Sequence, residues 1–385
     1  MMFLSFEFLE QDFDYILCLK FDFPLDIFKP DMNELTKSLK AIFDSDQDTF
    51  VLLTQRKEAP LHNISNDEYI YSFSCTFHHF KEMMKSRGQV KLLSKKLLFE
   101  LLNYIGNGYS CMRIIVRQIP FGVEEVLTIN HCDVIIPHRG HTAYLRNLIS
   151  FLNKLKNINV FVGIDEPLTR EKFEFRHSYP NTFFYSFKPN PIGPYVIRNW
   201  LINEGRSHFV FFQDSDDIPC ADRFERLSSF MTRNSIPFCG SHEIRMNYFN
   251  KTIQAIRYPK NVTTLLKNGP ANALLNASCA IERNAFYYCN RLSEDKIFAN
   301  DTKFLYYSYF KLKKIGNIDE FLYIRRLYPG SLTTSPLTSI GSPIRMHLIN
   351  RWVIDFALVK LGLLKLEDSC LNYNTSKRKF KVKKL

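Results

Sequence analysis

Glycine is scarce in this sequence, at 14 of 385 residues, and no internal repeat or low-complexity segment precedes the C-terminal tail. These absences exclude fibrous and disordered chains. No run reaches the roughly 18 apolar residues that a membrane-spanning helix needs, so no spanning segment is expected. With 45% hydrophobic and 23% charged residues, the chain has a globular composition. Its length fits two domains, or one large domain with extensions.

Paired cysteines are also missing. The nine cysteines form no C-x-x-C pair and no Cys/His cluster at zinc spacing, which indicates a reducing compartment. The N-terminal stretch MMFLSFEFLEQDFDYILCLKFDF is apolar, but it contains acids and lacks the basic region of a signal peptide. We therefore expect a cytoplasmic protein, either free or peripheral on the inner face of the membrane.

Acidic residues are outnumbered by basic ones, 39 against 51, which gives a net charge of +12. The surplus favours anionic partners such as nucleotides, phosphosugars, nucleic acid or an anionic membrane. Half of it lies in the tail SKRKFKVKKL, which has no acid. The tail has two interpretations: a solvated, frayed terminus, or a tether to anionic lipid in which each basic residue contributes about 1 kcal/mol.

The first part of the chain, residues 1–130, has an irregular pattern. Strands are expected at 49–55, 68–77 and 114–119, and leucines at helical spacing predict a helix over 91–105. No residue pattern in this part indicates chemistry. We expect an accessory α+β extension whose role is packing or contact with a partner.

From residue 132 onward, buried strands alternate with amphipathic helices. Strands are expected in CDVIIPHRG, INVFVGIDEP and HFVFFQDSDD, and helices in TAYLRNLISFLNKLKN and GPYVIRNWLINEG. Continuous apolar strands separated by helices predict a parallel sheet covered on both faces. Such sheets bind ligands beyond the carboxyl ends of their strands.

Three carboxylates follow the last of these strands, at Asp214, Asp216 and Asp217. If the backbone stays extended, Asp214 and Asp216 point the same way. Two such oxygen donors suit Mg²⁺ or Mn²⁺, whose coordination shell is completed by phosphate oxygens and water. A bound cation would also remove the repulsion between the carboxylates. Alternatively, Asp216 and Asp217 start a turn and cap the helix in CADRFERLSSFM.

Four stretches between about 132 and 335 resemble, in the same order, the family-2 nucleotide-sugar glycosyltransferases of the GT-A fold. They are DVIIPHRGHTAYLRNLISFL, VGIDEP, GPYVIRNWLINEGRSHFVFFQDSDDIPCADRFERL and FANDTKFLYYSYF. The resemblance implies a Rossmann-like α/β domain over 131–340, with a mixed, mostly parallel sheet flanked by helices. The sequence departs from the family where His138-Arg139 replaces an aromatic-Asn pair, where Glu166-Pro167 follows Asp165, and where Ala-Asn precedes Asp301.

The activity that the resemblance implies is metal-dependent, inverting transfer of a sugar from a nucleoside-diphosphate sugar to a hydroxyl of a glycan or lipid-linked acceptor. Asp214 and Asp216 would hold Mn²⁺ or Mg²⁺ against the diphosphate. Asp301 would be the general base, although a helix N-cap is the alternative for this residue.

The resemblance also implies a set of donor-binding residues. Asp165 would accept hydrogen bonds from the base, and Arg198 would contact the nucleotide or hold Asp214. Arg325 or Arg326 would pair with the diphosphate, the alternative being a surface loop at this point. The full set is Pro137, His138, Arg139, Asp165, Arg198, Asp214, Arg325 and Arg326.

Residues 341–385 are expected to form a helix, interrupted near Gly362, and the basic tail. The helix packs on the catalytic domain or lies on a membrane surface. Competing functions are a nucleotidyltransferase of related fold, a non-catalytic protein that binds anionic surfaces or nucleic acid, and a degenerate transferase fold. The single glycine of PHRGHT argues against the nucleotidyltransferase. We expect no nucleic-acid partner, because the surplus charge lies partly in the tail.

Overall fold

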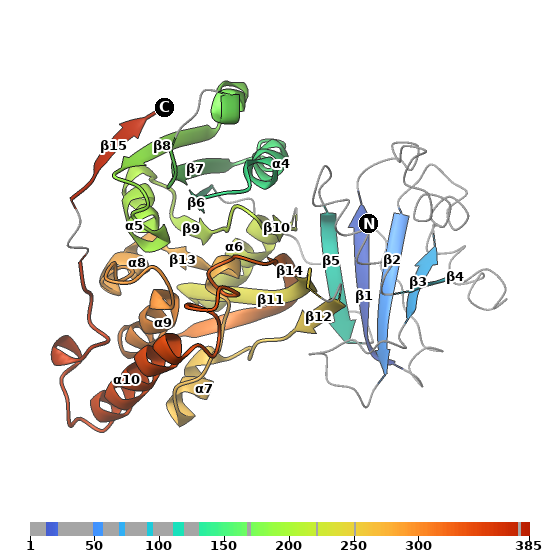
Figure 1. The fold of residues 1–385 in the computed structure, drawn as a ribbon. Helices are drawn as coiled ribbons and strands as arrows, with labels where there is room; N and C mark the ends of the chain where they lie inside the picture. Colours follow the sequence, from blue (N-terminus) through green and yellow to red (C-terminus); the bar gives the residue numbers. More distant parts are fainter. Residues whose placement is uncertain are drawn as a thin grey trace.

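The computed structural model describes residues 131–167, 171–220, 222–249, 252–375 and 379–385, together with five strands of the preceding region. Those five strands form an antiparallel sheet in the order β4-β3-β2-β1-β5 (Figure 1). They are β1 (Phe13–Phe21), β2 (Thr49–Arg56), β3 (Tyr69–Phe73), β4 (Lys91–Ser94) and β5 (Cys111–Gln118).

The strands predicted in this region are confirmed where the structure describes them, in β2, β3 and β5. The helix predicted over 91–105 is wrong at its start, because residues 91–94 form β4 and pair with β3. A short apolar run fits either period, and here pairing with a neighbouring strand decides the outcome. The remainder of that predicted helix lies outside the described residues.

A second sheet of ten strands carries the rest of the chain, in the order β10-β14-β11-β13-β9-β6-β7-β8-β15, with β12 paired to β11. The neighbours β8, β7, β6 and β9 are parallel, as are β11 and β14. The strands are β6 (Cys132–His138), β7 (Ile158–Ile164), β8 (Thr182–Lys188), β9 (Phe209–Phe212), β10 (Ile218–Pro219), β11 (Phe238–Asn247), β12 (Thr252–Ile256), β13 (Ala280–Glu282), β14 (Ile315–Leu327) and β15 (Lys381–Lys384).

Helices cover both faces of this sheet, and two apolar cores result. Successive residues of β6 alternate between the cores. Ile135 belongs to the core that includes Ile197, Phe286, Phe304 and Phe356, whereas Val134 and Ile136 belong to the core that includes Leu145 and Phe224. The helices are α4 (Thr142–Leu152), α5 (Pro194–Glu204), α6 (Arg223–Asn234), α7 (Val262–Asn268), α8 (Arg283–Tyr288), α9 (Asn300–Lys311) and α10 (Pro343–Lys360). The expected α/β fold with a mixed sheet flanked by helices is confirmed.

The sequence prediction missed two elements between β7 and α5. A 3₁₀ segment, η2 (Glu171–Ser178), and the strand β8 lie there, so HFVFFQDSDD supplies the fourth parallel strand rather than the third. The helix α4 ends at Leu152, before the predicted NKLKN extension. Both differences leave the aspartates at the end of β9 in place.

The C-terminal helix α10 packs on the domain. Its Phe356 ring lies 5.3 Å from the Tyr306 ring and 5.0 Å from the Phe310 ring, both on α9. The helix ends at Lys360, and Gly362 follows with a left-handed φ of +72°, as the predicted interruption requires. One face of this helix therefore packs on the domain, as one of the two interpretations expects, and contact of its other face with a membrane stays a prediction.

The frayed-terminus interpretation of the basic tail is wrong for residues 381–384. They form β15, an antiparallel edge strand on β8, in which Lys384 lies over the ring of Phe183. Figure 1 shows β15 and α10 at opposite ends of the domain. In the part of the chain that the structure describes, no helix has both the length and the apolar character to cross a bilayer.

Candidate active site

The candidate site lies where β6 and β9 run side by side in the sheet. These two parallel strands connect to helices on opposite faces, because β6 leads into α4 and α5 leads into β9. The strand order therefore reverses between them. A crevice opens beyond the carboxyl ends of strands at such a point, and ligands of α/β proteins bind there.

The backbone turns sharply after β9 instead of staying extended. The N–H of Asp217 donates to the carbonyl of Asp214 at 3.3 Å, so residues 214–217 form a tight turn. The turn alternative is thus confirmed here. The proposed cap of the following helix is wrong, because Asp222 occupies the N-cap position of α6.

Each carboxylate of this turn has a different partner. Asp214 accepts a hydrogen bond from the guanidinium of Arg198 on α5, and its side chain is 39% exposed. Asp216 is half-buried and accepts from the hydroxyl of Tyr328. Burial, and then the nearby charge of Asp214, raises the pKa of Asp216. Two partly exposed carboxylates are therefore held close together.

Asp217 is the structural member of the group. It is buried, and its two oxygens accept from the Tyr323 hydroxyl at 2.9 Å and from the Arg326 N–H at 2.8 Å. Burial, followed by the charges of Asp216 and Asp214, raises its pKa well above the ordinary value. Both bonding partners lie on β14, so Asp217 fixes the turn to the sheet.

Helix α5 connects these aspartates to Asp301. Tyr195 and Arg198 lie one turn apart on α5, with the guanidinium 5.7 Å from the centre of the tyrosine ring. Arg198 bonds Asp214, and the Tyr195 hydroxyl donates to Oδ1 of Asp301 at 3.0 Å. Burial, and then the charge of Asp301, raises the pKa of Tyr195 well above its usual range. The tyrosine therefore stays a protonated donor.

Asp301 is not the N-cap of its helix. Ala299 holds that position with a left-handed φ of +62°, and Asp301 lies within the first turn of α9. An acid in the first turn is favoured by the helix dipole. The position leaves the carboxylate half-buried and facing Tyr195 of α5.

Asp165, the predicted base contact, connects β7 to the start of α5. It is buried, and its two oxygens accept from the backbone N–H groups of Ile192 at 2.7 Å and Gly193 at 3.0 Å. Gly193 has a φ of +101°, which favours glycine. Asp165 thus positions the helix that carries Tyr195 and Arg198, and its contact with a base stays a prediction.

His138 connects the end of β6 to the aspartate turn. Its Nδ1 lies 2.9 Å from Ser215 Oγ, between Asp214 and Asp216, and its Nε2 lies 3.2 Å from a Glu166 oxygen. The ring is buried, while the flanking Pro137 is partly exposed and Arg139 is exposed. The structure therefore brings β6 to the aspartates through His138.

Arg325 and Arg326 lie within β14, so the surface-loop alternative for this segment is wrong. The Arg326 guanidinium donates to the backbone carbonyl of Asp216 and lies 4.3 Å from the centre of the Tyr144 ring. Arg325 instead pairs with Glu243 of β11 at 3.9 Å. Of the two, Arg326 is the one whose hydrogen bonds reach the aspartate turn.

Sequence reasoning missed the tyrosines of this site. Tyr328 binds Asp216 from a position 112 residues away, and no local pattern marks such a contact. The His141 ring, before α4, lies 4.9 Å from the Tyr328 ring in an edge-on arrangement. For Tyr195 a signal existed, because it stands three positions before Arg198 and shares a helix face with it.

The donor atoms fit a divalent cation only in part. Among the residues described, no group of three or more His, Cys, Asp or Glu side chains is arranged to hold a metal. Asp214 and Asp216 supply two carboxylates. Mg²⁺ and Mn²⁺ sites commonly use one or two protein carboxylates and take the other ligands from phosphate and water. The pair therefore fits a cation that binds together with a diphosphate.

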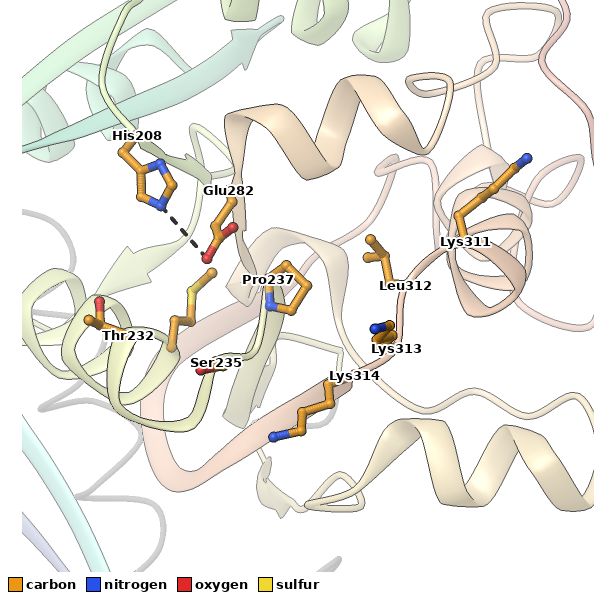
Figure 2. A pocket seen from close by; sticks show the side chains of 10 residues that line it. His208, Thr232, Ser235, Pro237, Glu282, Lys311, Leu312, Lys313 and Lys314 are labelled. Atoms are coloured by element: carbon orange, nitrogen blue, oxygen red, sulfur yellow. Dashed lines mark ion pairs between the residues drawn. The ribbon is translucent and has the colours of Figure 1, made fainter.

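A shallow pocket of about 520 Å³ lies at the other end of the strands (Figure 2). Its wall includes His208 and Pro237, which directly precede β9 and β11, and Lys313 and Lys314, which precede β14. Within it, His208 Nε2 lies 3.7 Å from Glu282. None of the sequence-predicted site residues lines this pocket.

Comparison with solved structures finds a similar fold in TarS of S. aureus. The match to TarS 1–349 covers 59% of this chain and 71% of the TarS chain, at 16% identity and a TM-score of 0.43. The match to TarS 1–349 in complex with UDP covers 59% of this chain and 65% of the TarS chain, at 16% identity and a TM-score of 0.46. The match to the complex with UDP-GlcNAc covers 61% of this chain and 77% of the TarS chain, at 16% identity and a TM-score of 0.44. No protein-family model and no curated protein matches the sequence. At such values the likeness assigns neither activity nor ligand.

Chemically, the site has two sides, which α5 connects. One side holds paired carboxylates next to the guanidinium groups of Arg198 and Arg326. The other holds Asp301, which is hydrogen-bonded to a neutral tyrosine. The first group suits a metal-bound diphosphate, and the second suits proton abstraction.

Proposed function

We propose that this chain is a metal-dependent glycosyltransferase that moves a sugar from a nucleoside-diphosphate sugar to an acceptor hydroxyl, with inversion. The observation that carries the proposal is that Asp214 and Asp216 follow β9 at the strand-order reversal, and that Arg198 and Tyr195 of α5 connect Asp214 to Asp301. A metal-binding pair and a separate base are what a single displacement of a diphosphate leaving group needs.

The donor would lie across the ends of β6 and β9, with its diphosphate next to Asp214 and Asp216. These two residues would hold Mn²⁺ or Mg²⁺, which when bound stabilises the negative charge of the departing nucleoside diphosphate. Arg198 orients Asp214, and Tyr328 orients Asp216. Arg326, whose guanidinium already reaches the turn, would add charge-assisted hydrogen bonds to the phosphates.

The acceptor hydroxyl would approach Asp301 from the opposite side of the sugar. Tyr195 donates to Oδ1 of Asp301, so the proton would pass to the other carboxylate oxygen. General-base assistance of this kind is worth about 10²–10⁴-fold in rate. The acceptor would be a hydroxyl of a glycan or of a lipid-linked saccharide.

The nucleotide base would lie towards the β6 and β7 ends. Pro137 and His138 would border it from β6, and the exposed Arg139 would extend that edge. Asp165, which fixes the start of α5 through the N–H groups of Ile192 and Gly193, would contact it at the end of β7.

The experiment is incubation of the full chain with UDP- and GDP-sugars in the presence of Mn²⁺, with separate assays for nucleoside diphosphate and for pyrophosphate. We expect nucleoside diphosphate. Asp301→Asn should lower turnover by about 10²–10⁴-fold and leave donor affinity unchanged, because asparagine still accepts the Tyr195 hydrogen bond. Asp216→Asn should weaken donor binding that depends on the metal.

Asp368→Asn is the matched control, since this exposed carboxylate lies in η4 (Leu366–Asp368) and should leave both quantities unchanged. Release of pyrophosphate would favour the nucleotidyltransferase instead. If neither product forms and no sugar nucleotide binds with or without Mn²⁺, the proposal is wrong.

A further inference from the structure

Most of the exposed large hydrophobic side chains in the described part of the chain lie in one segment. We call them the α10 surface. Its members are Leu332, Leu337, Ile340, Ile344, Met346, Ile354, Leu361 and Leu363. Five of them are at least 58% exposed in this fold, namely Leu337, Ile340, Ile354, Leu361 and Leu363. Singly exposed apolar residues are normal, but many of them within one segment indicate an interaction site.

The members of this group are brought together by α10 and the loop before it. Arg345, in the first turn of α10, donates to the carbonyls of Thr338 at 2.8 Å and Leu332 at 3.5 Å, which fixes the loop against the helix. On the helix itself, Ile354 stands opposite both buried anchors, Trp352 and Phe356. Ile354 thus faces away from the domain.

The outer face of α10 mixes the exposed apolar Ile354 with exposed polar and basic residues, His347, Asn350 and Arg351, and the exposed Leu361 follows its last residue. Aliphatic and basic side chains side by side on one helix face suit a membrane interface. Here only one face is packed against α9 in the described structure. The outer face is therefore left for a partner that accepts both aliphatic and basic side chains.

The charges around this surface are almost all positive. Residues 331–365 include four basic side chains, Arg345, Arg351, Lys360 and Lys365, and one acid, Asp355. Asp355 accepts a hydrogen bond from the Cys370 N–H at 2.6 Å, so its charge is directed to the backbone. Two acids follow, of which Glu367 pairs with Lys311 at 3.6 Å.

We propose that the α10 surface docks on the interface of an anionic lipid bilayer. Aliphatic side chains interleaved with basic ones match the acyl and headgroup layers of such a membrane. A second copy of the chain is a poorer partner, because a two-fold axis would place this basic surface against itself. The β15 tail is not part of the contact, since it lies at the other end of the domain (Figure 1).

The α10 surface begins close to the candidate site. Tyr328, whose hydroxyl binds Asp216, accepts a hydrogen bond at its carbonyl from Thr334 at 2.8 Å, within the loop that carries Leu332 and Leu337. A docked enzyme would therefore meet acceptors at the lipid surface. This last step rests on the proposed function and narrows its acceptor to a saccharide carried on a lipid.

The test is co-sedimentation of the full chain with two kinds of vesicle, phosphatidylcholine alone and phosphatidylcholine mixed with phosphatidylglycerol. We expect binding to the mixed vesicles and much weaker binding to the neutral ones. The double variant Ile354→Ser/Leu361→Ser should lower binding by about 10- to 100-fold, because two exposed aliphatic side chains no longer enter the interface.

Two matched controls separate this surface from others. Tyr288→Ser removes a 63% exposed ring on α8, and Lys381→Ser/Lys383→Ser lowers the charge of the β15 tail; both should bind like the wild type. Equal binding of the Ile354→Ser/Leu361→Ser variant, equal binding to neutral vesicles, or loss of binding only in the tail variant would each overturn the proposal.

Light scattering of the lipid-free protein should give a monomer; a dimer that this double variant dissociates would assign the surface to a second copy and overturn docking on lipid. The same variant should release nucleoside diphosphate from the donor at the wild-type rate in lipid-free buffer. Vesicle binding without any such release in the wild type would contradict the proposed function alone.

Discussion

At the residue scale, the site depends on hydrogen bonds that orient carboxylates rather than on the carboxylates alone. Asp214, Asp216 and Asp301 are each held by a side chain from another element: Arg198, Tyr328 and Tyr195. A charge-assisted bond of this kind restricts the rotamers of the carboxylate, and a catalytic group must be held in a productive geometry before its chemistry counts.

Tyr195→Phe tests this orientation directly. The change removes the hydroxyl that donates to Asp301 and keeps the ring beneath Arg198. We expect kcat to fall by about tenfold, with donor affinity unchanged, because the base loses its orientation but the diphosphate side of the site is intact. Steady-state kinetics with varied donor and acceptor measure both quantities.

Tyr287→Phe is the control for that prediction. Its hydroxyl donates at 2.9 Å to Asn203 on the solvent-exposed side of α5, so kcat should not change. A Tyr195→Phe enzyme with wild-type kcat would show that the hydrogen bond to Asp301 has no role in turnover.

At the scale of elements, the two faces of α10 contribute unequally to the stability of the fold. Phe356 is fully buried among the rings of α9, whereas Ile354 is 58% exposed. Phe356→Ala should lower the free energy of unfolding by about 3–5 kcal/mol through the cavity that it leaves. Ile354→Ala should change it by less than about 0.5 kcal/mol. Urea denaturation measures both, and equal losses would contradict the assigned packing.

A second element-scale feature is the charged cluster between β11 and β14. Asp319 of β14 lies 3.0 Å from His242 Nε2, 3.1 Å from Arg257 and 2.6 Å from Lys260. Burial alone would raise the pKa of Asp319, but hydrogen bonds from His242 and Lys260 and the charge of Arg257 outweigh burial and hold it well below its ordinary value.

That depressed pKa sets a pH dependence. Because the folded-state pKa lies below the unfolded value of about 3.9, Asp319 stabilises the fold above this pH, and the contribution is lost as pH falls through the folded pKa. Asp319→Asn should cost about 0.5–1.5 kcal/mol at pH 7, a figure lowered for its partial exposure, and progressively less as pH falls below about 4. Urea unfolding at several pH values measures it, and a cost that is constant with pH would contradict the ionic origin.

For the whole molecule, the sequence contained enough to predict the layered α/β domain and the position of three aspartates directly after β9. Apolar runs such as VFF and the acids behind them are local signals, and the structure places both as expected. The order of strands was not predictable in the same way. Pairing of β15 to β8 joins residues almost two hundred positions apart, and nothing local in KVKK indicates its partner.

In the candidate site, too, the local features were predictable from the sequence and the long-range contacts were not. Asp214 and Asp216 were marked by their position after a strand, and the structure adds what a linear pattern lacks: the turn that separates them and the tyrosines and arginines that hold them. Arg325 and Arg326 are neighbours in sequence but bond to different partners, because successive residues of a strand face opposite ways.

The most direct test of the account is a crystal of the full chain soaked with Mn²⁺ and a nucleoside diphosphate, examined by anomalous scattering. We predict one Mn²⁺ peak within about 2.0–2.6 Å of carboxylate oxygens of Asp214 or Asp216 and of the diphosphate, beyond the carboxyl ends of β6 and β9. A map in which Asp214 and Asp216 keep only their bonds to Arg198 and Tyr328, with metal and nucleotide bound elsewhere, would contradict it.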